Sequence, residues 1–188
     1  VVVLVPSAAT PAGAAARGAV IGERLQQDLR GRRGAGRWGV VAGRAFPGVW
    51  GVPRSYEEAR ESLSLADRLD SDDDVAQPRD LLVYRVLGRD QAAIVDLVRD
   101  VLGPLEQVRG GAQVLLETLQ VYFDAGDVAT EAARRLHVSV RTVTYRLARV
   151  AQLTGYRVSR PDQRFSLHAA VLGARLLDWP ATQLPPDP

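Results

Sequence analysis

Arginine, tyrosine and hydroxyl side chains are interspersed with apolar residues in the segment HVSVRTVTYRL, residues 137–147. Arginine donates paired hydrogen bonds to guanine or phosphate, and hydroxyls bond to phosphates or base edges. Val143, Leu147 and Val150 recur at intervals of four and three, which predicts a helix over residues 139–151 with one buried stripe. The polar side chains then share the opposite face, where they can bind a partner.

This polar face predicts contacts with DNA. Arg141, Thr144 and Tyr145 are expected to read base edges, whereas Arg146 and Arg149 are expected to contact phosphates. The other residues expected at the DNA have hydroxyl or small apolar side chains: Thr130, Ser139, Val140 and Thr142.

The preceding residues predict a shorter helix that packs against this one. Thr130 is expected to cap the helix EAARRL, in which Ala132 and Ala133 allow another helix to approach closely. In the turn HVS, Val138 points inward and Ser139 caps the next helix. Two helices joined by a three-residue turn predict a helix-turn-helix, whose second helix enters the major groove.

The stretch from Arg134 to Arg164 has a large excess of positive charge. It contains eight arginines and one acidic residue, Asp162, which gives a formal charge of +7. A solvent-exposed surface without a partner normally mixes both signs. The excess therefore predicts an electrostatic partner rich in phosphate, and double-stranded DNA fits the helix-turn-helix.

The composition is that of an ordinary folded protein and excludes several kinds of chemistry. Apolar residues make up 46% of the 188 residues, and no apolar run approaches the roughly 20 residues of a membrane helix. The chain has no cysteine, which excludes disulfides and thiolate catalysis, and its 24 basic residues are all arginine, which excludes catalytic lysines. We therefore expect a cytoplasmic protein with no membrane partner. Because methionine is also absent, we expect a C-terminal piece of a longer protein.

Strands and helices are expected to alternate in the first part of the chain. Residues 1–5 and the segment RWGVVAG, residues 37–43, have the pattern of strands, and residues 19–29 have that of a helix. Ser55 and Glu58 have the spacing of a capping box, which predicts that the next helix starts at Ser55. A further helix over residues 90–102 ends at Gly103 and Pro104.

These elements predict two domains of different class. An α/β or α+β domain is expected at 1–104, a linker at 105–111, an all-α domain at 112–180 and a flexible tail at 181–188. The Ala/Gly/Pro-rich residues 6–18 leave open whether the first domain is continuous there.

The sequence LLETLQVYFDAGDVATEAARRLHVSVRTVTYRLARVAQLTG, followed by RFSLHAAVLGARLL, closely resembles the C-terminal DNA-binding domain of PucR-type bacterial transcriptional regulators. That family's helix-turn-helix is similar to the one of Fis, and the resemblance covers about residues 112–177. His137 stands where many helix-turn-helix proteins have glycine. The segments around RSYEEA and VLGPL resemble, more loosely, the degenerate GGDEF-like domain of the same family. That resemblance implies a scaffold without cyclase activity, because no Gly-Gly-acidic-Glu-Phe string occurs.

Two groups of residues imitate metal sites, and neither meets the requirements. The acidic segment 70–74 begins like a calcium loop, but Val75 and Leu81 replace its glycine and its glutamate. His137 and His168 have no further histidine or cysteine at ligand spacing. We expect no catalytic residue, no metal and no cofactor.

Two other segments allow more than one interpretation. RGRRGAGRWG, residues 30–39, could meet a phosphate but lacks a dinucleotide fingerprint, so a flexible turn is favoured. Phe46, Trp50 and Tyr56 either form local core, which is favoured, or present a surface for an effector or partner.

The function expected from the sequence is a sequence-specific transcriptional regulator that inserts the helix 139–151 into the major groove of promoter DNA. A homodimer is expected, because two recognition helices strengthen weak half-site contacts. A small-molecule effector or an upstream sensory region would control it. The alternatives are a ligand-binding, partner-binding or dimerisation module without DNA binding, and a nucleotide-binding or cyclase-like enzyme, which the missing motif disfavours.

Overall fold

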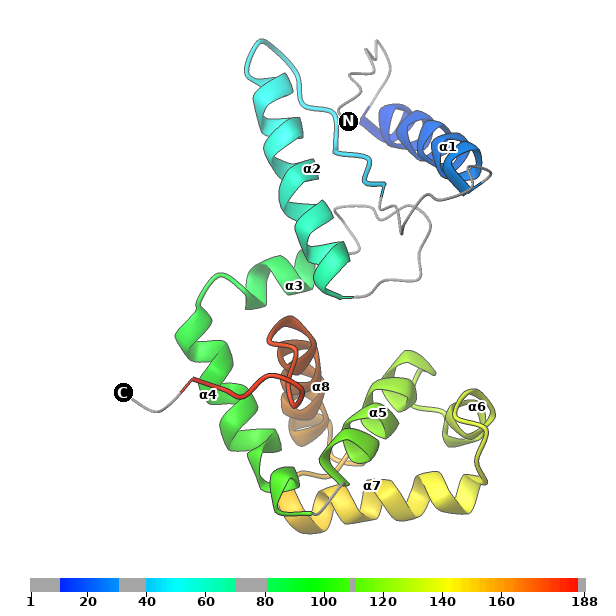
Figure 1. Ribbon diagram of the computed structural model, residues 1–188, viewed down its shortest axis with the longest axis vertical. Helices are drawn as coiled ribbons and strands as arrows, with labels where there is room; N and C mark the ends of the chain where they lie inside the picture. The colour runs from blue at the N-terminus through cyan, green and yellow to red at the C-terminus, as the bar shows by residue number, and fades with distance from the viewer. Residues whose placement is uncertain (1–10, 31–39, 70–80, 109–110, 186–188) are drawn as a thin grey trace. The chain divides into compact units, whose positions relative to one another are not determined.

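The computed structural model describes four stretches of the chain: 11–30, 40–69, 81–108 and 111–185. The chain divides into two compact units, Val1–Val86 and Leu87–Pro188. Within the described stretches the regular structure is helical, with an isolated bridge residue at Val41 and no strand (Figure 1).

The described part of the N-terminal unit contains α1 (Pro11–Arg30), α2 (Gly51–Arg68) and α3 (Leu82–Leu87), which ends at the boundary between the units. The helix expected at 19–29 is confirmed as part of α1. The strand expected at 1–5 lies outside the described residues.

The strand expected in RWGVVAG is wrong for residues 40–43, the part of it that is described. The backbone of Gly43 lies directly against α2. A Cβ atom at this glycine would lie 2.6 Å from the Ser55 carbonyl oxygen and 3.2 Å from the Ala59 Cβ. The segment therefore packs on a helix through its backbone.

The start predicted for α2 is also wrong, because the helix begins at Gly51, one turn before Ser55. Its N-cap residue is Trp50, which makes no side-chain capping bond. The Glu58 carboxylate does not form the predicted capping box, since it binds Arg44.

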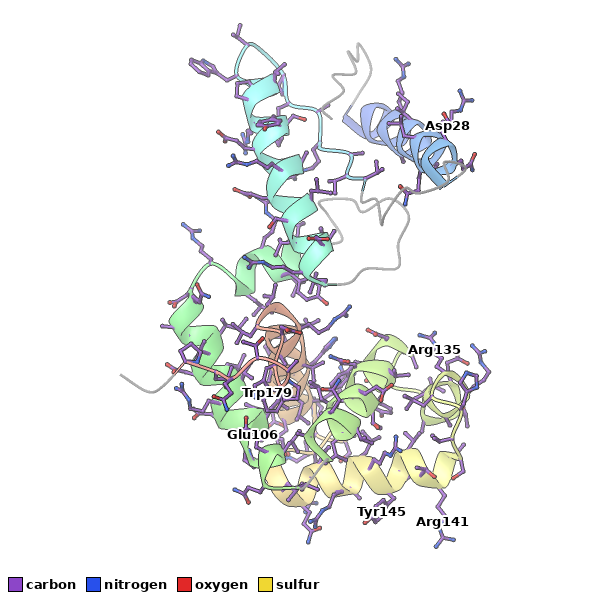
Figure 2. The ribbon with its side chains drawn as sticks, viewed as in Figure 1. Asp28, Glu106, Arg135, Arg141, Tyr145 and Trp179 are labelled. Atoms are coloured by element: carbon purple, nitrogen blue, oxygen red, sulfur yellow. The ribbon has the colours of Figure 1, made fainter. Side chains whose placement is uncertain are left out.

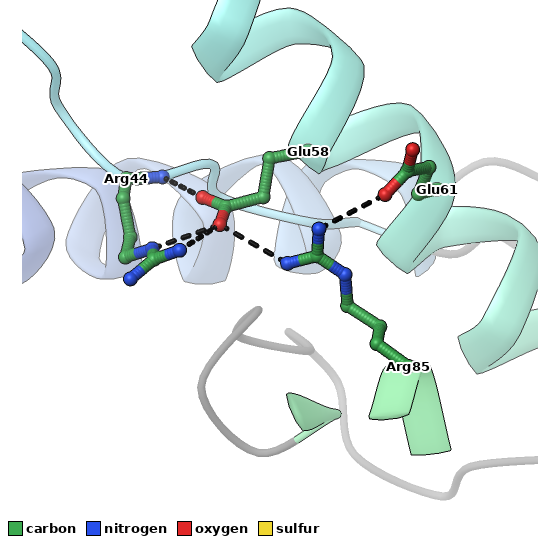
Figure 3. Close-up of polar contacts among 4 residues, drawn as sticks. All are labelled: Arg44, Glu58, Glu61 and Arg85. Carbon is green, nitrogen blue, oxygen red and sulfur yellow. Dashed lines mark hydrogen bonds and ion pairs between the residues drawn. The ribbon is translucent and has the colours of Figure 1, made fainter. Parts of the chain in front are cut away.

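Glu58 is the centre of the polar network in this unit, and only 5% of its side chain is exposed (Figure 3). Its carboxylate accepts hydrogen bonds from the Arg44 backbone N–H at 3.1 Å and from Arg44 Nε at 2.8 Å. Arg85 bridges Glu58 and Glu61, with N–O distances of 3.2 and 3.0 Å. Burial raises the pKa of the Glu58 carboxyl, but the two arginines outweigh burial and hold that pKa below its usual value.

The described part of the C-terminal unit contains six helical elements: α4 (Gln91–Leu102), the 3-10 helix η1 (Gly103–Gln107), α5 (Gly111–Asp124), α6 (Ala129–Arg135), α7 (Val140–Thr154) and α8 (Pro161–Leu176). Their core includes the fully buried side chains of Leu102, Leu105, Leu119 and Leu167. The helix expected at 90–102 is confirmed, and the Asp90 side chain caps it by accepting a hydrogen bond from Ala93 N at 3.0 Å.

α4 packs along α8 inside the C-terminal unit, although the sequence placed it in the first domain (Figure 1). The contact is close because Gly173 has no side chain: a Cβ atom there would lie 2.8 Å from Ile94 Cγ1 and 3.0 Å from Val98 Cγ2. Leu105, the first residue of the expected linker, is fully buried. The helix-turn-helix therefore belongs to a domain whose core also includes α4 and η1.

The last described residues pack against the core of this domain. Trp179 is 3% exposed, and its Nε1 donates a hydrogen bond to Glu106 Oε1 at 2.9 Å (Figure 2). Leu184, in the segment expected as a tail, packs against the core. No helix in the described stretches has both the length and the apolar character needed to span a lipid bilayer.

Candidate nucleic-acid interface

α6 and α7 pack against each other through small and branched side chains. Ala132, Ala133 and Val143 form a buried cluster in which Val143 is 0% exposed and Ala133 is 4% exposed. Val138 packs against this cluster from the turn, as its position predicted. The two helices and their turn are therefore held as one unit against α5.

His137 gives the turn its sharp change of direction. Its φ angle is 54°, in the left-handed region that favours glycine. The His137 N–H bonds to the Arg134 carbonyl at 3.3 Å, and the Val138 N–H bonds to the Ala133 carbonyl at 3.0 Å. This backbone angle is one that glycine adopts without strain and that histidine adopts at a cost.

Ser139 caps α7, as predicted. Its Oγ accepts a hydrogen bond from the Thr142 N–H at 3.0 Å and lies 2.8 Å from Thr142 Oγ1. The helix continues beyond the predicted end at residue 151 to Thr154, and Gly155 ends it with a φ angle of 79°. A left-handed glycine is a common helix C-terminus.

The predicted cap at Thr130 is wrong. α6 begins at Ala129 after Val128, which makes no side-chain capping bond, so Thr130 lies within the first turn and is exposed. The two residues of the preceding turn, Gly126 and Asp127, both have positive φ angles, 65° and 66°. This turn brings the chain into the helix two residues earlier than the hydroxyl pattern suggests.

Arg141, Thr144 and Tyr145 are exposed on α7. Arg141 and Tyr145 project from α7 away from α5 and α6 (Figure 2). Tyr145 is 69% exposed, and Val140 beside them is 42% exposed. Among the described residues, none forms a hydrogen bond or ion pair with the Arg141 guanidinium. This side chain is therefore available to an external acceptor.

The remaining polar residues of α7 have partners within the chain. Thr144 Oγ1 donates to the Val140 carbonyl at 2.9 Å, which leaves its lone pairs to accept a bond. Arg149 Nη1 donates to Gln152 Oε1 at 2.6 Å on the helix surface. Arg146 Nη1 instead donates to Thr118 Oγ1 on α5 at 3.2 Å.

Acidic residues just before the basic stretch neutralise part of its charge. Glu131 pairs with Arg134 at 2.7 Å and with Arg135 at 2.8 Å, and Asp127 pairs with Arg164. The two hydrogen bonds lower the pKa of the Glu131 carboxyl from 4.5 to about 2. Glu131 precedes its partners by three and four residues, a helical spacing that the sequence already shows. The charge available to a polyanion is thus smaller than +7.

The sequence also suggested two metal sites and a phosphate-binding segment as alternatives. His168 stacks on Phe123 with ring centroids 4.4 Å apart, and His137 is an exposed turn residue. Within the described stretches, no group of three His, Cys, Asp or Glu side chains is placed to hold a metal ion. The acidic segment 70–74 and residues 31–39 of the glycine-rich segment lie outside those stretches.

The aromatic residues near α2 do not form the local core that the sequence predicts. The Arg54 guanidinium lies over the Phe46 ring at 4.4 Å, whereas Trp50 is 83% and Tyr56 is 42% exposed. Residue type alone could not predict that Phe46 is less exposed than Trp50 and Tyr56, because their exposure depends on the turn before α2.

Two family models match the chain. Residues 115–172 match the PucR C-terminal helix-turn-helix domain, and residues 1–65 match the GGDEF-like domain. The resemblance of both parts to PucR-type regulators is thereby confirmed.

Curated relatives and a solved structure are also similar to the chain. Uncharacterized proteins from Mycobacterium bovis and Mycobacterium tuberculosis are 33% identical over 137 residues, which is 73% of this chain and 32% of theirs. The chain thus spans about a third of the length of these relatives. The regulator of polyketide synthase expression from Bifidobacterium adolescentis is 23% identical, with a TM-score of 0.42 over 93% of this chain and 78% of that chain.

Proposed function

Because the chain carries a PucR C-terminal helix-turn-helix domain together with a GGDEF-like domain, we propose that it is a transcriptional regulator that binds promoter DNA through α7. The observation that carries this proposal is the exposed face of α7, where Arg141 has no partner among the described residues. A buried side and a capped N-terminus hold that face in a fixed orientation. A recognition helix needs this combination to reach base edges in the major groove.

The residues of α7 divide into two roles in this proposal. Arg141 donates two parallel hydrogen bonds to a guanine, and Tyr145 and Thr144 contact the neighbouring bases. Val140 can touch a thymine methyl group. Phosphate contacts come from Arg149 and from the first turn of α7, where Ser139 and Thr142 lie. Thr130 is a further phosphate contact.

The other features of the proposal concern regulation. The GGDEF-like match supports an α/β fold and a non-enzymatic role for the N-terminal part, in which a bound effector would change the affinity for DNA. A protein that binds promoters must reach the chromosome, which fits a cytoplasmic location. The effector, the location and any upstream sensory region are proposals about the whole protein.

Selection of bound sequences from random duplexes tests this function. We expect enrichment of a motif that contains guanine. Arg141→Ala should relax the preference at one position, at a cost of about 1 to 3 kcal/mol, whereas Arg149→Ala should weaken binding to all sequences alike. Equal effects of both substitutions on selected and random DNA would contradict the division of roles, and no enrichment with the wild-type chain would contradict the function.

A second candidate function, association with another copy of the chain, is favoured by the surface of α2. Val52, Tyr56 and Leu63 recur at intervals of four and seven, and their exposed fractions lie between 42% and 52%. This spacing is that of a helix-pair interface. On the buried side of the same helix lies the charged residue Glu58, so the helix presents much of its apolar surface to solvent.

Two such helices packed antiparallel would place Val52 opposite Leu63 of the second copy. We expect the wild-type chain to sediment as a dimer and the variant Leu63→Arg to sediment as a monomer. Glu57→Arg is the matched control, because Glu57 is exposed on α2 outside the apolar stripe. A monomeric wild-type chain would contradict this second candidate and leave DNA binding by α7 to be tested on its own.

A further inference from the structure

One arginine of the recognition helix is directed toward the protein interior. Arg146 Nη1 lies 3.2 Å from Thr118 Oγ1, on the neighbouring helix α5. Thr118 is 0% exposed, and half-buried Arg146 is less accessible than Arg141. The Arg146 guanidinium thus joins the recognition helix to a buried polar atom.

The donors and acceptors of the two side chains make this contact specific. The Thr118 hydroxyl donates its single proton to the Val114 carbonyl at 2.7 Å, so its oxygen can only accept a further bond. Arginine has donors and no acceptor, which makes it a suitable partner. Without Arg146, no other described side chain bonds to this lone pair.

The position of Arg146 on the helix agrees with this contact. Arg146 precedes Leu147, follows Val143 by three residues and precedes Val150 by four, so it borders the buried stripe. Arg141 and Tyr145 are four residues apart and share the opposite, exposed side (Figure 2). A bond at the border of the stripe resists rotation of α7 about its own axis.

We propose that Arg146 is a positioning residue, which fixes the rotation of α7 against α5 through Thr118 and does not contact phosphate. This inference rests on the proposed function and changes the role that the sequence suggested for Arg146. Loss of the bond lets α7 rotate, and Arg141 and Tyr145 then meet the base edges less accurately. Contacts with phosphate tolerate such a rotation better, because they do not depend on the pattern of a base edge.

Salt dependence separates the two roles. A residue that contacts one phosphate contributes about 0.9 to the slope of log affinity against log salt concentration. If Arg146 is a positioning residue, Arg146→Gln leaves this slope unchanged and lowers the affinity for selected DNA relative to random DNA. A loss of stability alone would lower both affinities and keep their ratio.

The experiment measures binding of the full chain to selected and random duplexes over a range of salt concentrations. We expect Arg146→Gln and Thr118→Val each to reduce the ratio of the two affinities roughly fivefold, the factor that corresponds to about one hydrogen bond. The double variant should be no worse than either single variant. Thr118→Ser, which keeps the hydroxyl, should restore the wild-type ratio, and Arg149→Gln should reduce the slope by about 0.9.

Three different results would contradict the positioning role, the Arg146–Thr118 bond or the proposed function. A reduced slope for Arg146→Gln with no effect of Thr118→Val would make Arg146 a phosphate contact. Additive shifts of the unfolding midpoint in the double variant would show that the Arg146–Thr118 bond does not form. Absence of salt-dependent DNA binding in the wild-type chain would refute the proposed function, and the positioning role with it.

Discussion

The Ser139 hydroxyl accepts a hydrogen bond from the Thr142 backbone N–H at 3.0 Å and thereby fixes the first turn of α7. An N-cap bond of this kind contributes about 1 kcal/mol to stability. We therefore expect Ser139→Ala to lower the free energy of unfolding by about that amount, as measured by urea denaturation.

Ser139→Asp is the matched control for this cap. Aspartate keeps an acceptor for the Thr142 N–H, so stability should stay near that of the wild type. Its negative charge would repel a phosphate at the same helix end, so DNA affinity should fall. An alanine variant as stable as the wild type would show that the cap contributes nothing to this helix.

His137 adopts a φ angle of 54°, which costs a residue with a side chain about 1 kcal/mol relative to glycine. His137→Gly should therefore raise the free energy of unfolding by up to about 1 kcal/mol. The gain is reduced because glycine increases the conformational entropy of the unfolded chain, which favours unfolding. His137→Val should lower it, because a β-branched residue tolerates this region least. Thermal unfolding of the three chains gives the order directly, and a valine variant more stable than the glycine variant would contradict it.

Gly173 allows α8 to approach α4, and a Cβ atom there would lie 2.8 Å from Ile94 Cγ1. Gly173→Val should lower the free energy of unfolding by about 1 to 3 kcal/mol, since overpacking forces the two helices apart. Gly103→Ala is the control, because a Cβ atom at Gly103 meets nothing within 4 Å and its φ angle is −49°. Equal unfolding midpoints for Gly173→Val and the wild type would mean that the two helices do not pack as described.

The Glu131 carboxyl makes the free energy of unfolding depend on pH. Its carboxyl has a pKa of about 2 in the folded chain, below the ordinary 4.5, because Arg134 and Arg135 stabilise its charged form. A lowered folded-state pKa gives stability that is present above pH 4.5 and is lost as the pH falls toward 2. Between these pH values the wild type should lose more stability than Glu131→Gln, and salt should reduce the difference, since the pair is exposed. Parallel stability curves for the two chains would exclude this contribution.

The helix-turn-helix could be predicted from the sequence because its signals are local. The apolar spacing in α7, the Ser139 cap and the two alanines of α6 lie within about twenty residues, and the structure confirms each of them. The cap at Thr130 failed because two residues with positive φ angles set the start of α6, and hydroxyl preference does not reveal backbone angles.

Features that depend on distant partners could not be predicted. Glu58 and Ser55 have the spacing of a capping box, but Arg44 takes the carboxylate from 14 residues away. The place of α4 in the C-terminal unit depends on Gly173, about 80 residues later, which the sequence shows only as a small residue. Likewise, the hydrogen bond between Arg146 and Thr118 joins residues that are 28 positions apart, and no local pattern reveals it.

Binding of the full chain to duplex DNA, followed by fluorescence anisotropy over a series of salt concentrations, tests the central claim most directly. We expect affinity to fall steeply as salt rises, with a slope of about 0.9 for each phosphate contacted, and Arg141→Ala to reduce the preference for selected over random duplexes. Binding that does not depend on salt, or a wild-type chain that does not bind duplex DNA at all, would contradict it.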